Sequence, residues 1–240
     1  RERVGTATYL DLTRRTDPAR IPAVWDHLRE VLDAYGPPWV LQLITKDAAG
    51  VLQRGEPLLR RLLDGGTTIT LQLTVTGLAG TPWEPLVPAD GLGRARPLIA
   101  LIGGPGHVSW RYDPIIPGIH DPTRYARLAD AAAEIGIRRG VINYLAPPGR
   151  YRRADARIAS LLPGWEQGAP PGVPRYDLAW QQGVALELVA LARALGIALA
   201  CCAESAPLAG LVPGLGRAAC GDHAWFASLS GRNPPPVRTR

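Results

Sequence analysis

The fold is decided by residues 39–76, WVLQLITKDAAGVLQRGEPLLRRLLDGGTTITLQLTVT. Two short apolar runs with β-branched residues, 39–46 and 68–76, enclose a longer helical pattern over 48–66. A strand, a helix and a second strand in this order imply parallel pairing through a right-handed crossover. The stretch therefore predicts one β-α-β unit of an α/β fold.

The same alternation continues on both sides of this unit. It predicts further strands at 6–13, 107–115, 139–146 and 197–204, and further helices over 18–36, 122–136 and 176–196. Pro18 stands where a helix start is expected, and Gly36 where the helix stops. Six strands of this kind predict a partial (β/α)6 TIM-like barrel of parallel strands, in a single domain over 1–230 with a tail over 231–240.

A doubly wound open sheet is the alternative architecture. Its best signal is a glycine-rich turn after the first strand, and the turn here, LTRRTDPAR, contains no glycine. Two segments, 77–91 and 163–174, are predicted as loops. The second is rich in Gly and Pro, and it is either a lid or a surface connection.

The composition favours a cytoplasmic protein with a large core. Hydrophobic residues make up 46% of the 240 residues, and three cysteines without a secretory signal indicate a reducing compartment. No apolar run is long enough to span a membrane, so we expect no membrane partner. The net charge of +6 permits an anionic ligand or is simply a solvated basic surface. Nucleic acid is compatible with this charge, although no Arg or Lys stripe interleaved with aromatics supports it.

Polar residues gather where the predicted strands end. In a parallel α/β fold this edge holds the ligand, because the loops and helix N-termini that follow the strands converge there. These residues are Arg14, Arg15 and Asp17 after the first strand, Lys46 at the end of the second, Thr74, Arg111, Asp113 and Asn143 in the next three, Cys202 and Glu204 in the last, and Cys220 and Asp222 beyond it. A barrel rim that is polar only because it faces water, with Arg111 and Asp113 as an ion pair, fits the same pattern.

Lys46 is the only lysine in a chain that otherwise uses arginine. A compact ammonium is not interchangeable with a planar guanidinium, and burial can remove its charge. A lysine at a strand end therefore suggests a ligand contact, a proton donor or an imine former, and we rank contact above covalent chemistry. Chance survival on a surface is the other explanation.

Six short motifs follow one another along the chain: TRRTD (13–17), ITK (44–46), LQLTVTG (71–77), WRYDPI (110–115), CAE (202–204) and ACGD (219–222). Together they resemble a bacterial family labelled as a domain of unknown function, whose usual forms are SRRTD, WTKNP, FQFTLTG, WRYDPI, SCAE and ACID. The resemblance covers roughly residues 7–235, and WRYDPI is its most specific element. ITKDAA departs from the family's WTKNP in lacking its tryptophan and its asparagine.

That family continues into a C-terminal cysteine cluster similar to the signature of radical S-adenosylmethionine enzymes. The resemblance thus implies a radical-SAM-like barrel, with a 4Fe–4S cluster and S-adenosylmethionine as cofactors. This chain ends GRNPPPVRTR where the cysteine-rich tail would begin, and it contains no methionine. We therefore expect a fragment of a longer protein whose cluster ligands lie outside this chain. A cluster-less family member is the alternative.

The function implied is that of a radical-SAM-like oxidoreductase or lyase that binds its cofactor and a small anionic ligand at the strand ends. Lys46, Cys202 and Glu204 are the candidate catalytic residues. Arginine forks suit acidic groups, so Arg14, Arg15 and Arg111 are candidate anion contacts, as is Lys46. The carboxylates of Asp17, Asp113 and Glu204 would bind ribose hydroxyls or orient these cations, and Asn143 would be a neutral contact. The thiols of Cys202 and Cys220 would be hydrogen-atom donors or supporting ligands. The predicted ligand-binding set also includes Thr74 and Asp222.

Two functions of other classes compete with this one. A cluster-less barrel would bind a phosphorylated or nucleic-acid ligand without catalysis. A metal-dependent barrel hydrolase would need several histidines at strand ends, but His27 lies in a helical pattern and His107 at a strand start. We rank the hydrolase last, and we predict no metal site within this chain.

Overall fold

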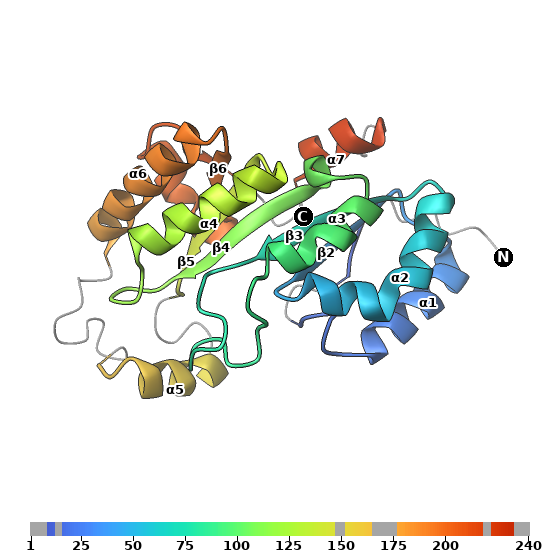
Figure 1. The fold of residues 1–240 in the computed structure, drawn as a ribbon, viewed down its shortest axis with the longest axis horizontal. Helices are drawn as coiled ribbons and strands as arrows, with labels where there is room; N and C mark the ends of the chain where they lie inside the picture. Colours follow the sequence, from blue (N-terminus) through green and yellow to red (C-terminus); the bar gives the residue numbers. More distant parts are fainter. Residues whose placement is uncertain (1–8, 13–15, 147–151, 165–176, 218–221, 233–240) are drawn as a thin grey trace. The chain divides into compact units, whose positions relative to one another are not determined.

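The computed structural model describes residues 9–12, 16–146, 152–164, 177–217 and 222–232 (Figure 1). The architecture is α/β, as predicted, and the part of the chain that is described contains seven strands. The chain divides into two compact units. Unit 1 comprises 1–74, 90–109 and 220–240, and unit 2 comprises 75–89 and 110–219. Closure into a barrel and a single domain over 1–230 stay predictions.

Unit 1 holds three parallel strands in the order β1-β2-β3. Its elements are β1 (Tyr9–Asp11), α1 (Ala23–Tyr35), β2 (Val40–Thr45), α2 (Ala48–Asp64), β3 (Thr68–Thr74), two 3-10 turns, η1 (Gly93–Ala95) and η2 (Pro105–His107), α3 (Arg96–Leu101) and α7 (His223–Ser230). The β-α-β unit predicted from residues 39–76 is confirmed. Asp47 explains where α2 begins, because its carboxylate accepts a hydrogen bond from the backbone N–H of Gly50.

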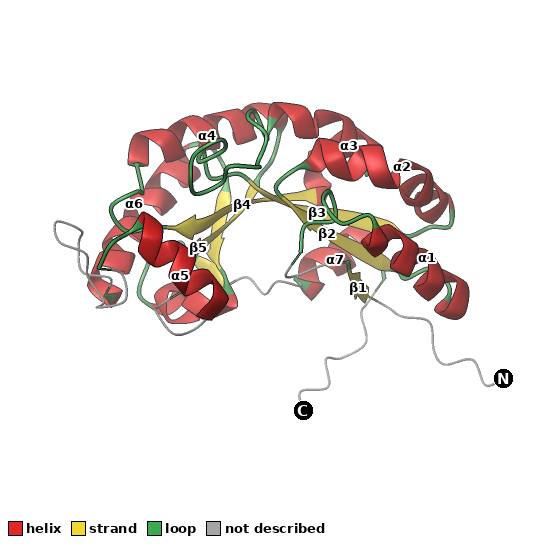
Figure 2. Cartoon of the chain, turned by 90° about the horizontal axis from the view of Figure 1, so that it is seen from below, coloured by secondary structure: helices red, strands yellow, loops and turns green. Residues whose placement is uncertain are grey.

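The two faces of the unit 1 sheet differ in polarity. Helices α1, α2 and α3 lie on the opposite side of this sheet from α7 (Figure 2). Leu41, Leu43 and the register partner Leu71 are fully buried and alternate with Val40, which packs against α7, so they lie on the face that the three helices cover. Side chains alternate along a strand, so Gln42 and its register partner Thr70 lie on the opposite face. Apolar and polar side chains therefore alternate along the strands of unit 1, and the strands are not continuously apolar.

Helix α7 covers the amino end of this polar face. Its Trp225 and Phe226 form a buried cluster with Val40 of β2, and Tyr9 of β1 packs against it. The Trp225 indole N–H also donates to the carbonyl of Gly106 at 3.2 Å.

Unit 2 holds four strands that are parallel in the order β4-β5-β6-β7. Its elements are β4 (Val108–Ile115, in this unit from Trp110 on), α4 (Pro122–Ile135), β5 (Arg139–Tyr144), α5 (Arg152–Leu161), α6 (Leu178–Ala194), β6 (Ala198–Cys201), the 3-10 helix η4 (Ala203–Gly210) and β7 (Gly216–Arg217). Asp121 and Asp177 cap α4 and α6 by accepting backbone N–H groups of Thr123 and Trp180.

The unit 2 sheet also has one face against helices. Trp110 stacks on Tyr125 of α4 with ring centroids 5.1 Å apart, and the Tyr144 hydroxyl donates to the Gln181 carbonyl of α6. Arg111 alternates with Trp110 along β4 and therefore lies on the other face. Asn143 alternates with Tyr144 along β5, so it lies on the same side as Arg111, the side that α4 and α6 do not cover.

Helix α5 lies beyond the carboxyl ends of β4 and β5 (Figure 1). Ile158 of α5 packs against a buried cluster that contains Ile116 and Leu145, the residues that follow these two strands, together with Leu78 and Leu162. The loop 77–91, which was predicted as a loop, supplies Leu78 and Trp83 to the same cluster. The segment 163–174 lies outside the described residues apart from Pro163 and Gly164.

Several predicted boundaries were wrong. Helix α1 begins at Ala23, not near Pro18, because Asp17 folds the chain into a turn in which its carboxylate accepts the N–H of Ala19 at 2.9 Å. The last predicted strand ends at Cys201, since a 3-10 helix begins at Ala203. Elements α3, α5, α7 and β7 were not predicted. Among the helices described, none combines the length and the apolar character needed to cross a membrane.

Candidate functional site

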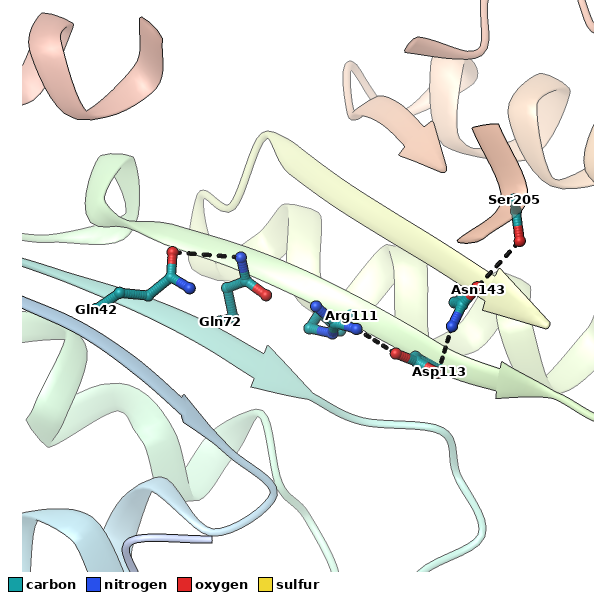
Figure 3. Close-up of polar contacts among 6 residues, drawn as sticks. All are labelled: Gln42, Gln72, Arg111, Asp113, Asn143 and Ser205. Carbon is teal, nitrogen blue, oxygen red and sulfur yellow. Dashed lines mark hydrogen bonds and ion pairs between the residues drawn. The ribbon is translucent and has the colours of Figure 1, made fainter. Parts of the chain in front are cut away.

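Four polar side chains on the face of unit 2 that α4 and α6 do not cover form a connected network (Figure 3). Arg111 of β4 is ion-paired with Asp113. The Asn143 amide Nδ2 of β5 lies 3.5 Å from Asp113 Oδ1, and the Ser205 hydroxyl of η4 donates to Asn143 Oδ1 at 3.0 Å. Three of the four were predicted from the sequence, as separate residues. The structure brings them together.

An irregularity in β4 accounts for this meeting. Tyr112 pairs with Ile142, but the next pair is Ile115 with Tyr144, so β4 contains one more residue than β5 over this step. The additional residue falls at Asp113–Pro114, where the peptide bond is cis. A bulge redirects a side chain relative to the regular pleat, and this one lies where Asp113 meets the Asn143 amide.

The network is largely shielded from water but not closed. The side chains of Arg111 and Asp113 keep 10% and 19% of their surface exposed, and Asn143 and Ser205 are buried. Arg111 compensates Asp113, so the network as a whole is neutral. A guanidinium has five N–H donors and a carboxylate has several lone pairs, so such a pair can still bind a further polar group.

The two adjacent cysteines, Cys201 and Cys202, differ in their surroundings. Cys201 is completely buried, and burial raises the pKa of its thiol. Cys202 follows it directly, and its backbone N–H donates to the Ile142 carbonyl, which places it beside Asn143. Glu204 belongs to η4, not to a strand end as predicted, and the structure does not describe its side chain.

The residue that sequence reasoning missed at this site is Ser205. Its backbone, at φ −106° and ψ 17°, interrupts η4, and its N–H donates to the Cys202 carbonyl. It adjoins the CAE motif, yet a serine just after a predicted strand carries no signal of its own. Only the fold shows that it reaches Asn143, 62 residues earlier.

In unit 1, Asp17 joins the segment after β1 to the end of β2. Its carboxylate accepts the Thr45 hydroxyl at 2.7 Å and the backbone N–H of Lys46 at 2.8 Å. Lys46 follows the last residue of β2 directly, and it is partly exposed. Asp17 therefore fixes the backbone that carries Lys46.

The remaining predicted residues are dispersed. Thr74 is the last residue of β3 and is buried. Asp222 caps α7 by accepting the N–H of Trp225 at 3.1 Å. Arg14, Arg15 and Cys220 lie outside the described residues. In the same unit, the amides of Gln42 and Gln72, which were not predicted, meet at 3.4 Å on the polar face (Figure 3).

A second polar group in unit 2 lies on the α4 side of the sheet. The Tyr112 hydroxyl contacts His120 Nδ1 at 3.3 Å, and His120 Nε2 is buried with no hydrogen-bond partner in the described part of the chain. Burial raises the pKa of Tyr112 to about 12. Burial is also the main cause that lowers the pKa of His120, against a smaller opposing effect of Asp121.

His120 should make the protein less stable in mild acid. Its pKa is lowered in the folded state, so below the ordinary histidine pKa of about 6.5 the unfolded chain binds the proton more readily. Stability is therefore lost as the pH falls from about 6.5 toward the folded-state pKa. Urea unfolding at pH 7.5 and pH 5.5 should show a smaller loss for His120→Gln than for the native protein.

The control for this experiment is His27→Gln. His27 lies on α1 with 76% of its side chain exposed, so the substitution removes a histidine without touching a buried contact. It should retain the acid-side loss of the native protein. If His120→Gln lost as much stability between pH 7.5 and pH 5.5 as the native protein, His120 would not be the cause of the acid-side loss.

No group of three or more His, Cys, Asp or Glu side chains is placed to hold a metal ion among the described residues. The two cysteines described, Cys201 and Cys202, are adjacent in sequence, and the first lies in the core. The described residues therefore do not fit the three thiolates of a 4Fe–4S cluster.

Comparison with known proteins finds no significant match among curated proteins. A family model does match: the family described as Domain of unknown function (DUF1848) covers residues 39–240 of the chain, from β2 through α7 and beyond. The matched segment contains the whole Arg111–Asp113–Asn143–Ser205 network. The chain therefore belongs to the DUF1848 family.

Proposed function

We propose that this member of the DUF1848 family binds a small ligand with an acidic group on the polar face of unit 2. The observation that carries the proposal is the network of Arg111, Asp113, Asn143 and Ser205, which joins β4, β5 and η4. A charged pair in a shielded position is costly unless it is well compensated. Its placement on the face away from α4 and α6, with part of Asp113 exposed, suits ligand contact better than core packing.

Arg111 is the proposed contact for the acidic group, because a guanidinium fork matches the oxygens of a carboxylate or a phosphate. Asp113 orients Arg111, and Asn143 supplies a neutral hydrogen-bonding group. Cys202 lies next to Asn143 and is the thiol nearest in sequence to the network. In unit 1, Lys46 remains a proposed ligand contact whose backbone Asp17 holds.

Binding of propyl phosphate, measured by calorimetry, tests this proposal. Arg111→Gln should weaken binding roughly tenfold, the effect of losing about one charge-assisted hydrogen bond. Arg138→Gln is the matched control, since Arg138 is an exposed arginine of the same unit whose guanidinium donates to backbone carbonyls alone in the described part of the chain. Equal affinities in the two variants would refute Arg111 as the contact.

We also propose that the full-length protein is a radical-SAM-like iron–sulfur enzyme. This rests on the series of motifs from TRRTD to ACGD, and the cluster would have to be held by residues other than those described.

Anaerobic iron and sulfide analysis of the protein made from the full open reading frame tests the second proposal. About four irons per chain are expected for a 4Fe–4S cluster. A colourless protein after cluster reconstitution would instead favour the non-catalytic alternative, in which the domain binds a phosphorylated or nucleic-acid ligand.

A further inference from the structure

The direction of each hydrogen bond in the unit 2 network follows from Asp113. A carboxylate paired with a guanidinium can only accept hydrogen bonds, so the part of the Asn143 amide that faces Asp113 is the NH2 group. The amide oxygen must then face Ser205. The Ser205 hydroxyl is consequently the donor in its 3.0 Å bond to Asn143.

This arrangement decides which groups remain for a ligand. Ser205 has used its only proton on Asn143, so its oxygen can only accept. The Asp113 oxygens also only accept, and 19% of the Asp113 side chain is exposed. Beside the guanidinium of Arg111, the network thus presents Asp113 as its exposed hydrogen-bond acceptor to an incoming molecule.

We infer that the ligand carries a hydrogen-bond donor, a hydroxyl or an ammonium group, close to its acidic group. The inference rests on the proposed function, and it narrows the ligand to hydroxylated or amino-bearing acids and phosphate esters. Ser205 is the positioning residue for this selectivity. It holds the Asn143 amide oxygen away from Asp113, so that the Asn143 group facing Asp113 is a hydrogen-bond donor and not a second acceptor.

Matched phosphate esters test the inference by calorimetry with the whole 240-residue chain. Glycerol 3-phosphate differs from propyl phosphate by two hydroxyl groups, and O-phosphoethanolamine carries an ammonium group. At least one of these two should bind roughly tenfold more tightly than propyl phosphate, the effect of about one additional hydrogen bond to a charged group. The better of the two tells whether the donor is hydroxyl or ammonium.

Variants of Ser205 test its part in the selectivity. Ser205→Ala should reduce the ratio of the two affinities, donor-bearing ester over propyl phosphate, to less than threefold. Ser205→Thr keeps the hydroxyl and should restore the preference. Ser228→Ala is the control, because the Ser228 hydroxyl donates to a backbone carbonyl within its own helix α7.

The possible binding results distinguish among the ligand inference, the proposed function and the role of Ser205. Equal affinity for the three esters would overturn the inference and leave the proposed anion contact standing. Failure of all three to bind would overturn the proposed function and the inference with it. A preference that survives Ser205→Ala would overturn the positioning role of Ser205.

Discussion

Replacing Gly55 by alanine is expected to destabilise the protein by about 2 kcal/mol or more, although this substitution normally stabilises a helix interior by about 1 kcal/mol. A Cβ atom on Gly55, within α2, would lie 2.2 Å and 2.3 Å from two ring carbons of Trp25 in α1. Trp25 is 2% exposed, and its indole N–H donates to the Pro18 carbonyl at 2.9 Å. The rigid ring has no room to withdraw, so α1 and α2 must separate.

The measurement is urea unfolding, with Gly183→Ala as the matched control. Gly183 also lies within a long helix, α6, but it is exposed, and a Cβ atom there would meet nothing within 4 Å. This control should be stabilised by up to about 1 kcal/mol. If Gly55→Ala gave the same gain, the close approach of Trp25 would be disproved.

Replacing Asp113 by alanine is expected to lower the free energy of unfolding by about 3 kcal/mol. This value is toward the lower end of the destabilisation that follows when one partner of a buried ion pair is removed. The reason is Arg111, whose side chain is 10% exposed and would keep its charge without the carboxylate that compensates it. Asn143 would also lose the acceptor of its amide N–H. The loss should appear in urea unfolding at neutral pH.

The double variant Arg111→Met with Asp113→Ala distinguishes this cause from general damage to β4. It removes the uncompensated charge together with its partner, so it should be more stable than Asp113→Ala alone. A double variant that is less stable than the single one would show that Arg111 contributes to stability independently of Asp113.

The sequence predicts the long elements well because each has its own local signals. The helices α2, α4 and α6 combine an apolar periodicity with an aspartate at the N-cap: Asp47, Asp121 and Asp177. Helix α7 has eight residues and β7 has two, too few for a periodicity to show. Their positions depend on packing partners that are distant in sequence, such as Val40 for α7.

For the candidate site, the sequence indicates residues but not their contacts. Arg111, Asp113 and Asn143 stand out as polar residues within apolar strand patterns. The bonds among them depend on the register of β4 against β5 and on the bulge at Asp113–Pro114, which no local pattern encodes. The contact of Tyr112 with His120 likewise forms through the loop that follows β4.

The division of the chain has a consequence for protein synthesis. A ribosome makes the chain from its amino end, and domains tend to fold as units in that order. Unit 1 supplies the first strands, but its α7 comes after all of unit 2 has been translated. Until then Val40 and Tyr9 lack the Trp225 and Phe226 side chains that pack on them. The unit that begins first on the ribosome is thus the one completed last.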